Sequence, residues 1–117
     1  QDENLLQMHI FPCENGDEFP KNQYTKWFDY DKIKGTLSLR HRQPGDYLTL
    51  PSGGRKTLKS WMIDEKIPRQ EREEIWLLAE EKHILWIVGH RISAYYKITE
   101  QTKTILEVEF NGGKSSG

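Results

Sequence analysis

Eight basic side chains are gathered in residues 40–72, the part of the sequence best suited to bind a ligand. Guanidinium and ammonium groups donate charge-assisted hydrogen bonds to phosphate oxygens. The same stretch holds four acidic residues and carries a net charge of +4, while residues 1–39 and 73–117 are both acidic overall. With a whole-chain charge of −1, the pattern permits one local basic surface, although charge alone favours an ordinary mixed-charge surface. The basic residues are Arg40, Arg42, Arg55, Lys56, Lys59, Lys66, Arg69 and Arg72.

Other residue types that do chemistry in proteins form no recognised catalytic or metal site in this sequence. His9 and Cys13 are four apart but have no second cluster of metal ligands nearby, so no metal is expected. Residues 52–54, Ser-Gly-Gly, lack the GxxxxGK[ST] pattern of a phosphate-binding loop and predict a tight turn. His41 falls on the apolar face of a predicted strand, which favours a structural histidine. An independent enzyme is therefore disfavoured.

The basic residues must be positioned by the elements around them. Residues 36–42 alternate between apolar and polar, which predicts a strand with Arg40 and Arg42 on the face away from the core. Pro44-Gly45-Asp46 predicts a turn after this strand, because proline fixes φ and glycine tolerates positive φ.

Two short helices are expected next. Residues 57–66 place Leu58, Trp61 and Met62 on one arc, flanked by Lys59 and Lys66. Pro68 ends that helix and starts a second one over residues 68–74, where Arg69 and Arg72 share a side. We expect Trp61, like Trp76 and Trp86, to lie in the core.

Strands follow the helices. Residues 75–79 and 83–88 predict a buried hairpin, and residues 105–110 alternate as a strand. Strands, two short helices and more strands predict an α+β fold. Along the chain we expect an extended, loop-rich lead-in over residues 1–35, in which residues 5–11 could form a strand, then one domain over residues 36–110 and a frayed tail over residues 111–117.

Length and composition set further limits. A chain of 117 residues suits one domain, and its longest apolar run is too short to span a membrane. The single cysteine excludes a disulfide framework and favours a reducing, cytoplasmic location. The chain starts at Gln1 without an initiator methionine, so we expect a fragment of a longer protein.

An ordered series of motifs resembles the C-terminal domain of bacterial tRNA(Ile)-lysidine synthetase. The resemblance begins near Trp27 and continues to Phe110. Gln43 and Tyr47 stand where the family commonly has more basic residues. The motifs are RHRQPGD at 40–46, KTLK at 56–59, DEKIPRQER at 64–72, WIVGHRIS at 86–93 and YKITEQT at 96–102.

The resemblance implies a parent enzyme that uses ATP to attach lysine to the wobble cytidine of an isoleucine tRNA with a CAU anticodon. Its catalytic PP-loop domain carries SGGxDS, whereas residues 52–54 here are followed by Arg55 and Lys56. The fragment is therefore expected to be inactive alone, with no cofactor; ATP and lysine are substrates of the parent. The family's tail is associated with the acceptor-stem end of the tRNA. A further resemblance, to a domain of the phenylalanyl-tRNA synthetase β chain, implies a small β-barrel-like mixed sheet with two inserted helices.

These expectations give a set of site residues and partners. Without aromatic side chains on a predicted exposed strand, we expect recognition of RNA backbone and shape, not base stacking. The partners are then tRNA and the catalytic domain of the same chain, with a homodimer as a further candidate. The rival interpretation is a protein-interaction module that docks on the catalytic domain or a second subunit. The expected RNA contacts are Arg40, Arg42, Arg55, Lys56, Lys59, Arg69, Arg72 and Arg91, and the expected structural residues are Pro44, Gly45, Asp46, Trp61, Pro68 and Gly89.

Overall fold

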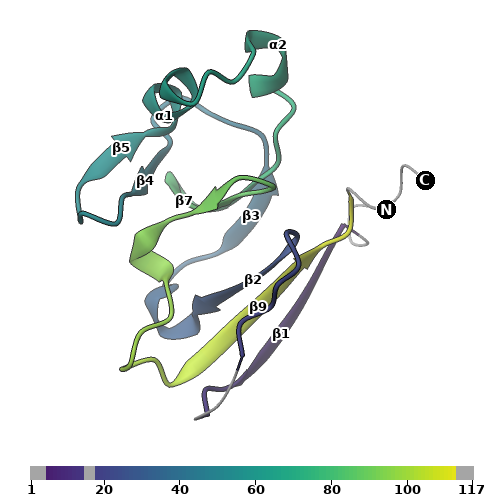
Figure 1. Ribbon diagram of the computed structural model, residues 1–117, viewed down its shortest axis with the longest axis vertical. Coiled ribbons are helices and arrows are strands. Elements are labelled where there is room, and N and C mark those ends of the chain that lie inside the picture. The colour runs from purple at the N-terminus through teal and green to yellow at the C-terminus, as the bar shows by residue number, and fades with distance from the viewer. Residues whose placement is uncertain (1–4, 15–17, 113–117) are drawn as a thin grey trace. The chain divides into compact units, whose positions relative to one another are not determined.

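The computed structural model describes residues 5–14 and 18–112, which belong to two compact units (Figure 1). Unit 2 is the continuous segment Ile33–Tyr96, and unit 1 combines the described parts of Gln1–Lys32 and Lys97–Gly117. The expected lead-in over residues 1–35 thus contributes to unit 1, where it forms two strands. Of the expected tail, residues 113–117 lie outside the described residues.

Unit 1 is built on a three-stranded antiparallel sheet in the order β1-β9-β2, with the yellow β9 central in Figure 1. The predicted alternation at its C-terminal end is confirmed, since Leu106, Val108 and Phe110 are buried while Glu107 and Glu109 are partly exposed. Nearby, the Thr102 hydroxyl donates a hydrogen bond to buried Asp29. The strands and the short 3-10 helix of this unit are β1 (Leu6–Pro12), β2 (Thr25–Asp29), η2 (Tyr30–Lys32) and β9 (Thr104–Phe110).

Unit 2 contains a second, mixed sheet in the order β3-β6-β7-β4-β5, with β8 paired to β7. All its described pairings are antiparallel except that of β4 with β7. Its elements are β3 (Leu37–Arg40), β4 (Tyr47–Thr49), β5 (Arg55–Thr57), α1 (Leu58–Asp64), α2 (Arg69–Arg72), β6 (Leu77–Glu80), β7 (His83–Ile87), β8 (Arg91–Ile92) and η3 (Ala94–Tyr96).

The fold class is α+β with two short helices, as predicted, but the barrel-like sheet is a wrong expectation. Within the described residues β3 and β5 form the two edges of the larger sheet, so that sheet is open. The likeness to a phenylalanyl-tRNA synthetase domain stays an expectation. No helix among the described residues is long and apolar enough to cross a membrane.

The helix α1 forms because its sequence caps it at both ends. Thr57 accepts a hydrogen bond from the Ser60 amide at the first turn, 3.1 Å away. At the other end the amides of Lys66 and Ile67 donate to the carbonyls of Ile63 and Met62, which is a Schellman motif. Lys66 adopts the left-handed conformation that this motif requires, with φ of 58°.

The apolar arc of α1 packs into the core of unit 2. Leu58, Trp61 and Met62 are buried there with residues from β4, β6 and β7. The expected core positions of Trp61 and Trp86 are confirmed, whereas Trp76 is only partly buried and stacks on His41. This packing holds α1 and the loop before β4 close together.

Candidate nucleic-acid interface

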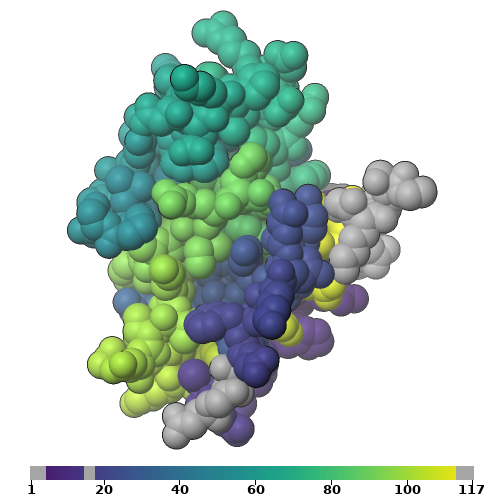
Figure 2. Space-filling view, viewed as in Figure 1, coloured from purple at the N-terminus to yellow at the C-terminus, as the bar shows by residue number. Residues whose placement is uncertain are grey.

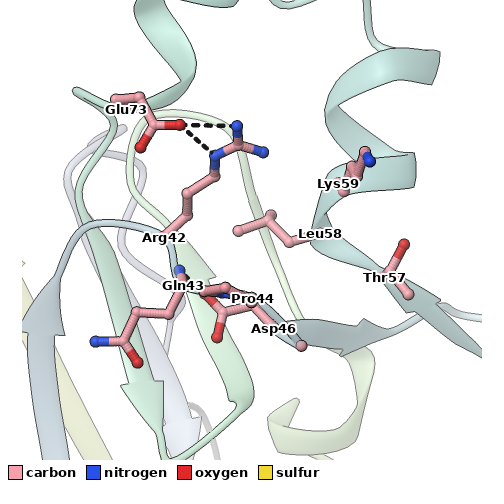
Figure 3. A pocket seen from close by; sticks show the side chains of 9 residues that line it. Arg42, Gln43, Pro44, Asp46, Thr57, Leu58, Lys59 and Glu73 are labelled. Atoms are coloured by element: carbon pink, nitrogen blue, oxygen red, sulfur yellow. Dashed lines mark hydrogen bonds and ion pairs between the residues drawn. The ribbon is translucent and has the colours of Figure 1, made fainter.

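A cleft of about 510 Å³ opens in unit 2 between the 43–46 turn and the start of α1 (Figure 3). Arg42 and Glu73 line one side of it, and Lys59 projects from α1 on the other. The Leu58 side chain lies between them in this view. Two cations from separate segments, the loop after β3 and the helix α1, therefore line one cleft, with a hydroxyl at Thr57 and an amide at Gln43 also in its lining.

The turn that borders the cleft is fixed by its sequence. The Asp46 amide donates to the Gln43 carbonyl at 3.3 Å, with Pro44 and Gly45 in the two central positions. Gly45 has φ of 89°, which is the conformation that the third residue of a type II turn needs. Pro44 and Gly45 thus have the turn geometry we expected of them.

Asp46 is a buried carboxylate, 2% exposed, that accepts hydrogen bonds from two segments. Its oxygens accept hydrogen bonds from both terminal nitrogens of Arg40, at 2.9 and 3.0 Å, and from the Gln43 amide at 2.8 Å. Its backbone carbonyl accepts from the Leu58 amide at 2.8 Å. Asp46 therefore ties β3 to the turn and the turn to the start of α1.

The prediction that Arg40 faces outward from the core is wrong. Its guanidinium is enclosed by Asp46 and also donates to the carbonyls of His41 and Glu81, at 2.9 and 2.7 Å. Only 16% of the side chain is exposed. The strand ends at Arg40, so Arg42 lies beyond it and the two arginines meet different partners. Arg40 therefore cross-links the fold, with four of its five N–H donors engaged inside the protein.

Arg42 is the more accessible of the two arginines. Its Nε and Nη2 donate to one carboxylate oxygen of Glu73 at 2.9 and 2.8 Å, as the dashed lines of Figure 3 mark. The pair is at the surface, since the Glu73 side chain is 63% exposed and that of Arg42 28%. A surface pair contributes about 0–1 kcal/mol, so another anion can displace the carboxylate at little cost.

The other six predicted RNA contacts fall into two groups, those with a partner inside the protein and those without a carboxylate partner. Lys56 pairs with Asp64, and Arg72 donates to the Ile67 carbonyl at 2.8 Å, so both stabilise the connection around the helices. Among residues 5–14 and 18–112, no carboxylate pairs with the other four, which are exposed: Arg55 on β5, Lys59 on α1, Arg69 on α2 and Arg91 on β8.

The other expected structural residues occupy positions that suit the role. Pro68 is the N-cap of α2, and Trp61 is 4% exposed in the core. Gly89 has φ of 84° in the turn where the His90 amide donates to the Ile87 carbonyl at 2.8 Å. Positive φ favours glycine there.

Arg55 lies on the β4–β5 hairpin, which projects as the blue-teal lobe at the left of Figure 2. Its guanidinium carbon lies 4.4 Å from the centre of the Tyr47 ring. Burial lowers the pKa of the neighbouring His83, and the Arg55 charge lowers it further, against a smaller opposing effect of Glu80. Sequence reasoning missed this aromatic environment, because its members come from separate segments.

Comparison with known proteins identifies the family. The model of the TilS substrate C-terminal domain matches residues 37–109, more than half of the chain. The chain belongs to this family. Two proteins named tRNA(Ile)-lysidine synthase are similar to this chain: one from Caldanaerobacter subterraneus subsp. tengcongensis is 46% identical over 95 residues, and one from Clostridium tetani is 41% identical over 97 residues.

The match covers only part of those relatives. The alignments include 80% and 82% of this TilS domain but 20% and 21% of the two synthases, so the chain spans about a fifth of their length. A crystal structure of a TILS C-terminal domain has a similar fold, with a TM-score of 0.64 and 27% identity, covering 92% of this chain and 85% of that one. The predicted resemblance is therefore confirmed.

Proposed function

We propose that this TilS C-terminal domain binds the phosphate backbone of tRNA in the cleft between Arg42 and Lys59. The observation that carries the proposal is that these two cations, from segments separate in sequence, line one cleft. Lys59 has no carboxylate partner among the described residues, and Arg42 has only an exchangeable surface one. Phosphates along an RNA strand can meet both groups at once, and contacts of this kind position RNA without reading its bases.

The name of the relatives extends the proposal to a parent enzyme. We infer that the domain serves a tRNA(Ile)-lysidine synthase, which attaches lysine to the wobble cytidine of an isoleucine tRNA with a CAU anticodon. In this role residues 36–110 engage the acceptor-stem end, while ATP and lysine are handled elsewhere in the parent. The catalytic domain of the same chain is then the second partner.

A salt titration of tRNA binding tests the cleft. Each phosphate contact contributes about 0.7–0.9 to the slope of log K against log salt. The double variant Arg42→Gln with Lys59→Gln should therefore bind more weakly than the unmodified chain and show a slope shallower by about 1.5. Lys56→Gln is the matched control for Lys59→Gln, because it removes the same charge from a nearby lysine that does not line the cleft. Its slope should stay near that of the unmodified chain.

The docking module remains the second candidate, and specific ion pairs favour it. Arg42 pairs with Glu73, and Lys56 pairs with Asp64, as expected of cations with structural roles. The double variant and the unmodified chain could show equal tRNA affinities and equal slopes, with unchanged circular dichroism. That result would contradict the cleft proposal and favour docking on the catalytic domain.

A further inference from the structure

Tyr47, His83, Tyr95 and Tyr96 form a continuous cluster of ring contacts in unit 2, which we call the aromatic stack although only one of its ring pairs is stacked. The Tyr47 and His83 rings are stacked with centroids 4.6 Å apart and planes 28° from parallel. His83 also contacts Tyr95 and Tyr96, at 5.3 and 4.8 Å, and these two tyrosines meet edge to face at 4.9 Å. The register partnership of Tyr47 and His83, where β4 and β7 run parallel, brings the rings together.

Arg55 extends the stack at one end. Its guanidinium lies 4.4 Å from the Tyr47 ring centre, and His83 covers the same ring at 4.6 Å. Arg55 and His83 therefore both contact the Tyr47 ring. Arg55 is exposed and has no carboxylate partner among the described residues, which leaves its charge available to an anion.

The buried part of the stack is held rigidly. The Tyr96 hydroxyl donates to Glu80 at 2.7 Å, and the other oxygen of Glu80 accepts the amides of Lys34 and Gly35. His83 Nε2 lies 3.0 and 3.1 Å from the hydroxyls of Thr49 and Ser93. Rings fixed in this way lose little conformational entropy when a further ring is added.

The stack also reaches the surface. Tyr95 is 43% exposed, although its neighbours Ala94 and Tyr96 are partly and fully buried. The carboxylate nearest to the rings, Glu80, has both oxygens engaged by hydrogen bonds inside the unit. An exposed tyrosine at the surface and a free guanidinium on the same ring system suit a planar aromatic group that carries negative charge.

We propose that this stack binds an unpaired nucleobase of the RNA, with Tyr95 as the stacking face and Arg55 as the contact for an adjoining phosphate. The inference rests on the proposed function, because it names a further feature of the same RNA. Aromatic rings accept any base face, and arginine adds cation–π attraction and a phosphate contact. It replaces the expectation from sequence that bases are not stacked.

Two RNA hairpins that differ in one feature test the proposal. One is a blunt stem, and the other is the same stem with a short single-stranded 3′ extension that contains 2-aminopurine. The unmodified chain should bind the extended hairpin about tenfold more tightly, because stacking of one base on an aromatic ring contributes a free energy of this size. It should also quench the 2-aminopurine fluorescence, because the stacked base lies against the Tyr95 ring. Tyr95→Ala should abolish the quenching and most of the preference, with the Arg55 phosphate contact left in place, and should leave the affinity for the blunt stem unchanged.

Matched variants distinguish the loss of base stacking from a general loss of RNA affinity. Tyr95→Phe should keep the tenfold preference and the quenching, because the ring remains. Tyr30→Ala removes a tyrosine of similar exposure, 40%, from unit 1 and should behave like the unmodified chain. Equal affinity of the unmodified chain for the two hairpins would overturn the stacking site and leave the cleft proposal standing. If the chain bound neither hairpin, the proposed function itself would fail.

Discussion

Asp46 shows how one side chain can define the edge of a binding surface from within the protein. Its carboxylate holds Arg40 and the Gln43 amide, so the cleft residues Arg42 and Lys59 are presented by segments that Asp46 fixes. We therefore expect changes at Asp46 to act through stability, and changes at the cleft cations to act through RNA affinity.

Asp46→Asn should lower the free energy of unfolding by about 3 kcal/mol, because removing one partner of a buried ion pair leaves the other uncompensated. Urea unfolding followed by circular dichroism measures this. Asp64→Asn is the matched control, since Asp64 is also ion-paired but is 54% exposed, and it should cost about 1 kcal/mol or less. Similar costs for the two changes would show that the Arg40–Asp46 pair is not a structural cross-link.

Glu73→Gln should strengthen tRNA binding, because it frees Arg42 from a carboxylate that competes with phosphate. Glu74→Gln removes the same charge from the adjacent residue and controls for net charge. Fluorescence anisotropy with labelled tRNA at low salt should show the larger gain for Glu73→Gln. That excess should vanish when Arg42→Gln is also present, and an equal gain from both glutamates would argue against competition at the cleft.

At the scale of the element, the C-terminal end of α1 has a lysine in a backbone conformation that residues other than glycine rarely adopt. Lys66 has φ of 58° at the position where a Schellman motif usually has glycine. Lys66→Gly should therefore raise the stability by about 1 kcal/mol. Lys59→Gly, inside the helix, should lower it by a similar amount. Thermal unfolding of the two variants should shift in opposite directions, and a lower melting temperature for Lys66→Gly would mean that the lysine side chain itself stabilises the helix end.

Most elements of unit 2 could be predicted because their signals are local. The apolar arc of α1 and the buried runs of β6 and β7 depend only on the spacing of residues within each segment. The second strand of unit 1, β2, was missed, since its register depends on β9, which lies far away in sequence.

The candidate site was only partly predictable for the same reason. The sequence marks Arg42 and Lys59 as basic, and the turn residues Pro44 and Gly45 as a turn. It does not reveal that Arg40 forms an ion pair with the buried Asp46. The ion pair depends on where β3 ends. The predicted strand continued two residues too far, to residue 42, and so placed Arg40 and Arg42 on the same outward face.

Across the whole molecule, the pH dependence of stability should have two separate windows. The pKa of His83 lies below its ordinary value of 6.5, because burial and Arg55 disfavour its charged form. The unfolded chain then takes up the proton first, so stability falls as the pH drops through 6.5 towards the folded pKa. Burial alone would raise the pKa of Glu80, but hydrogen bonds from Tyr96, Gly35 and Lys34, with the His83 charge, lower it below 4.5, so its contribution is lost only under more acidic conditions.

Melting temperatures measured from pH 7.5 to pH 3.5 check this order. The unmodified chain should lose stability between about pH 7 and 5.5, and His83→Gln should be nearly flat in that window. Both proteins should weaken below pH 4.5, where Glu80 of the unfolded chain takes up a proton more readily than Glu80 of the folded chain. Equal slopes for the two proteins above pH 5.5 would assign the effect to another group.

The central position of β9 has a consequence for synthesis on the ribosome. β9 pairs with β1 and β2 on its two sides, and the register joins Leu6 to Phe110, residues about a hundred positions apart. Translation delivers β1 and β2 early and β9 last, so neither early strand can find its native neighbour while the chain is still short. The strands of unit 2 are all made within one continuous segment, Ile33–Tyr96, and can pair as they emerge. The order of synthesis therefore makes the three-stranded sheet the last part to assemble and leaves the edges of β1 and β2 open to other strands until residues 104–110 arrive.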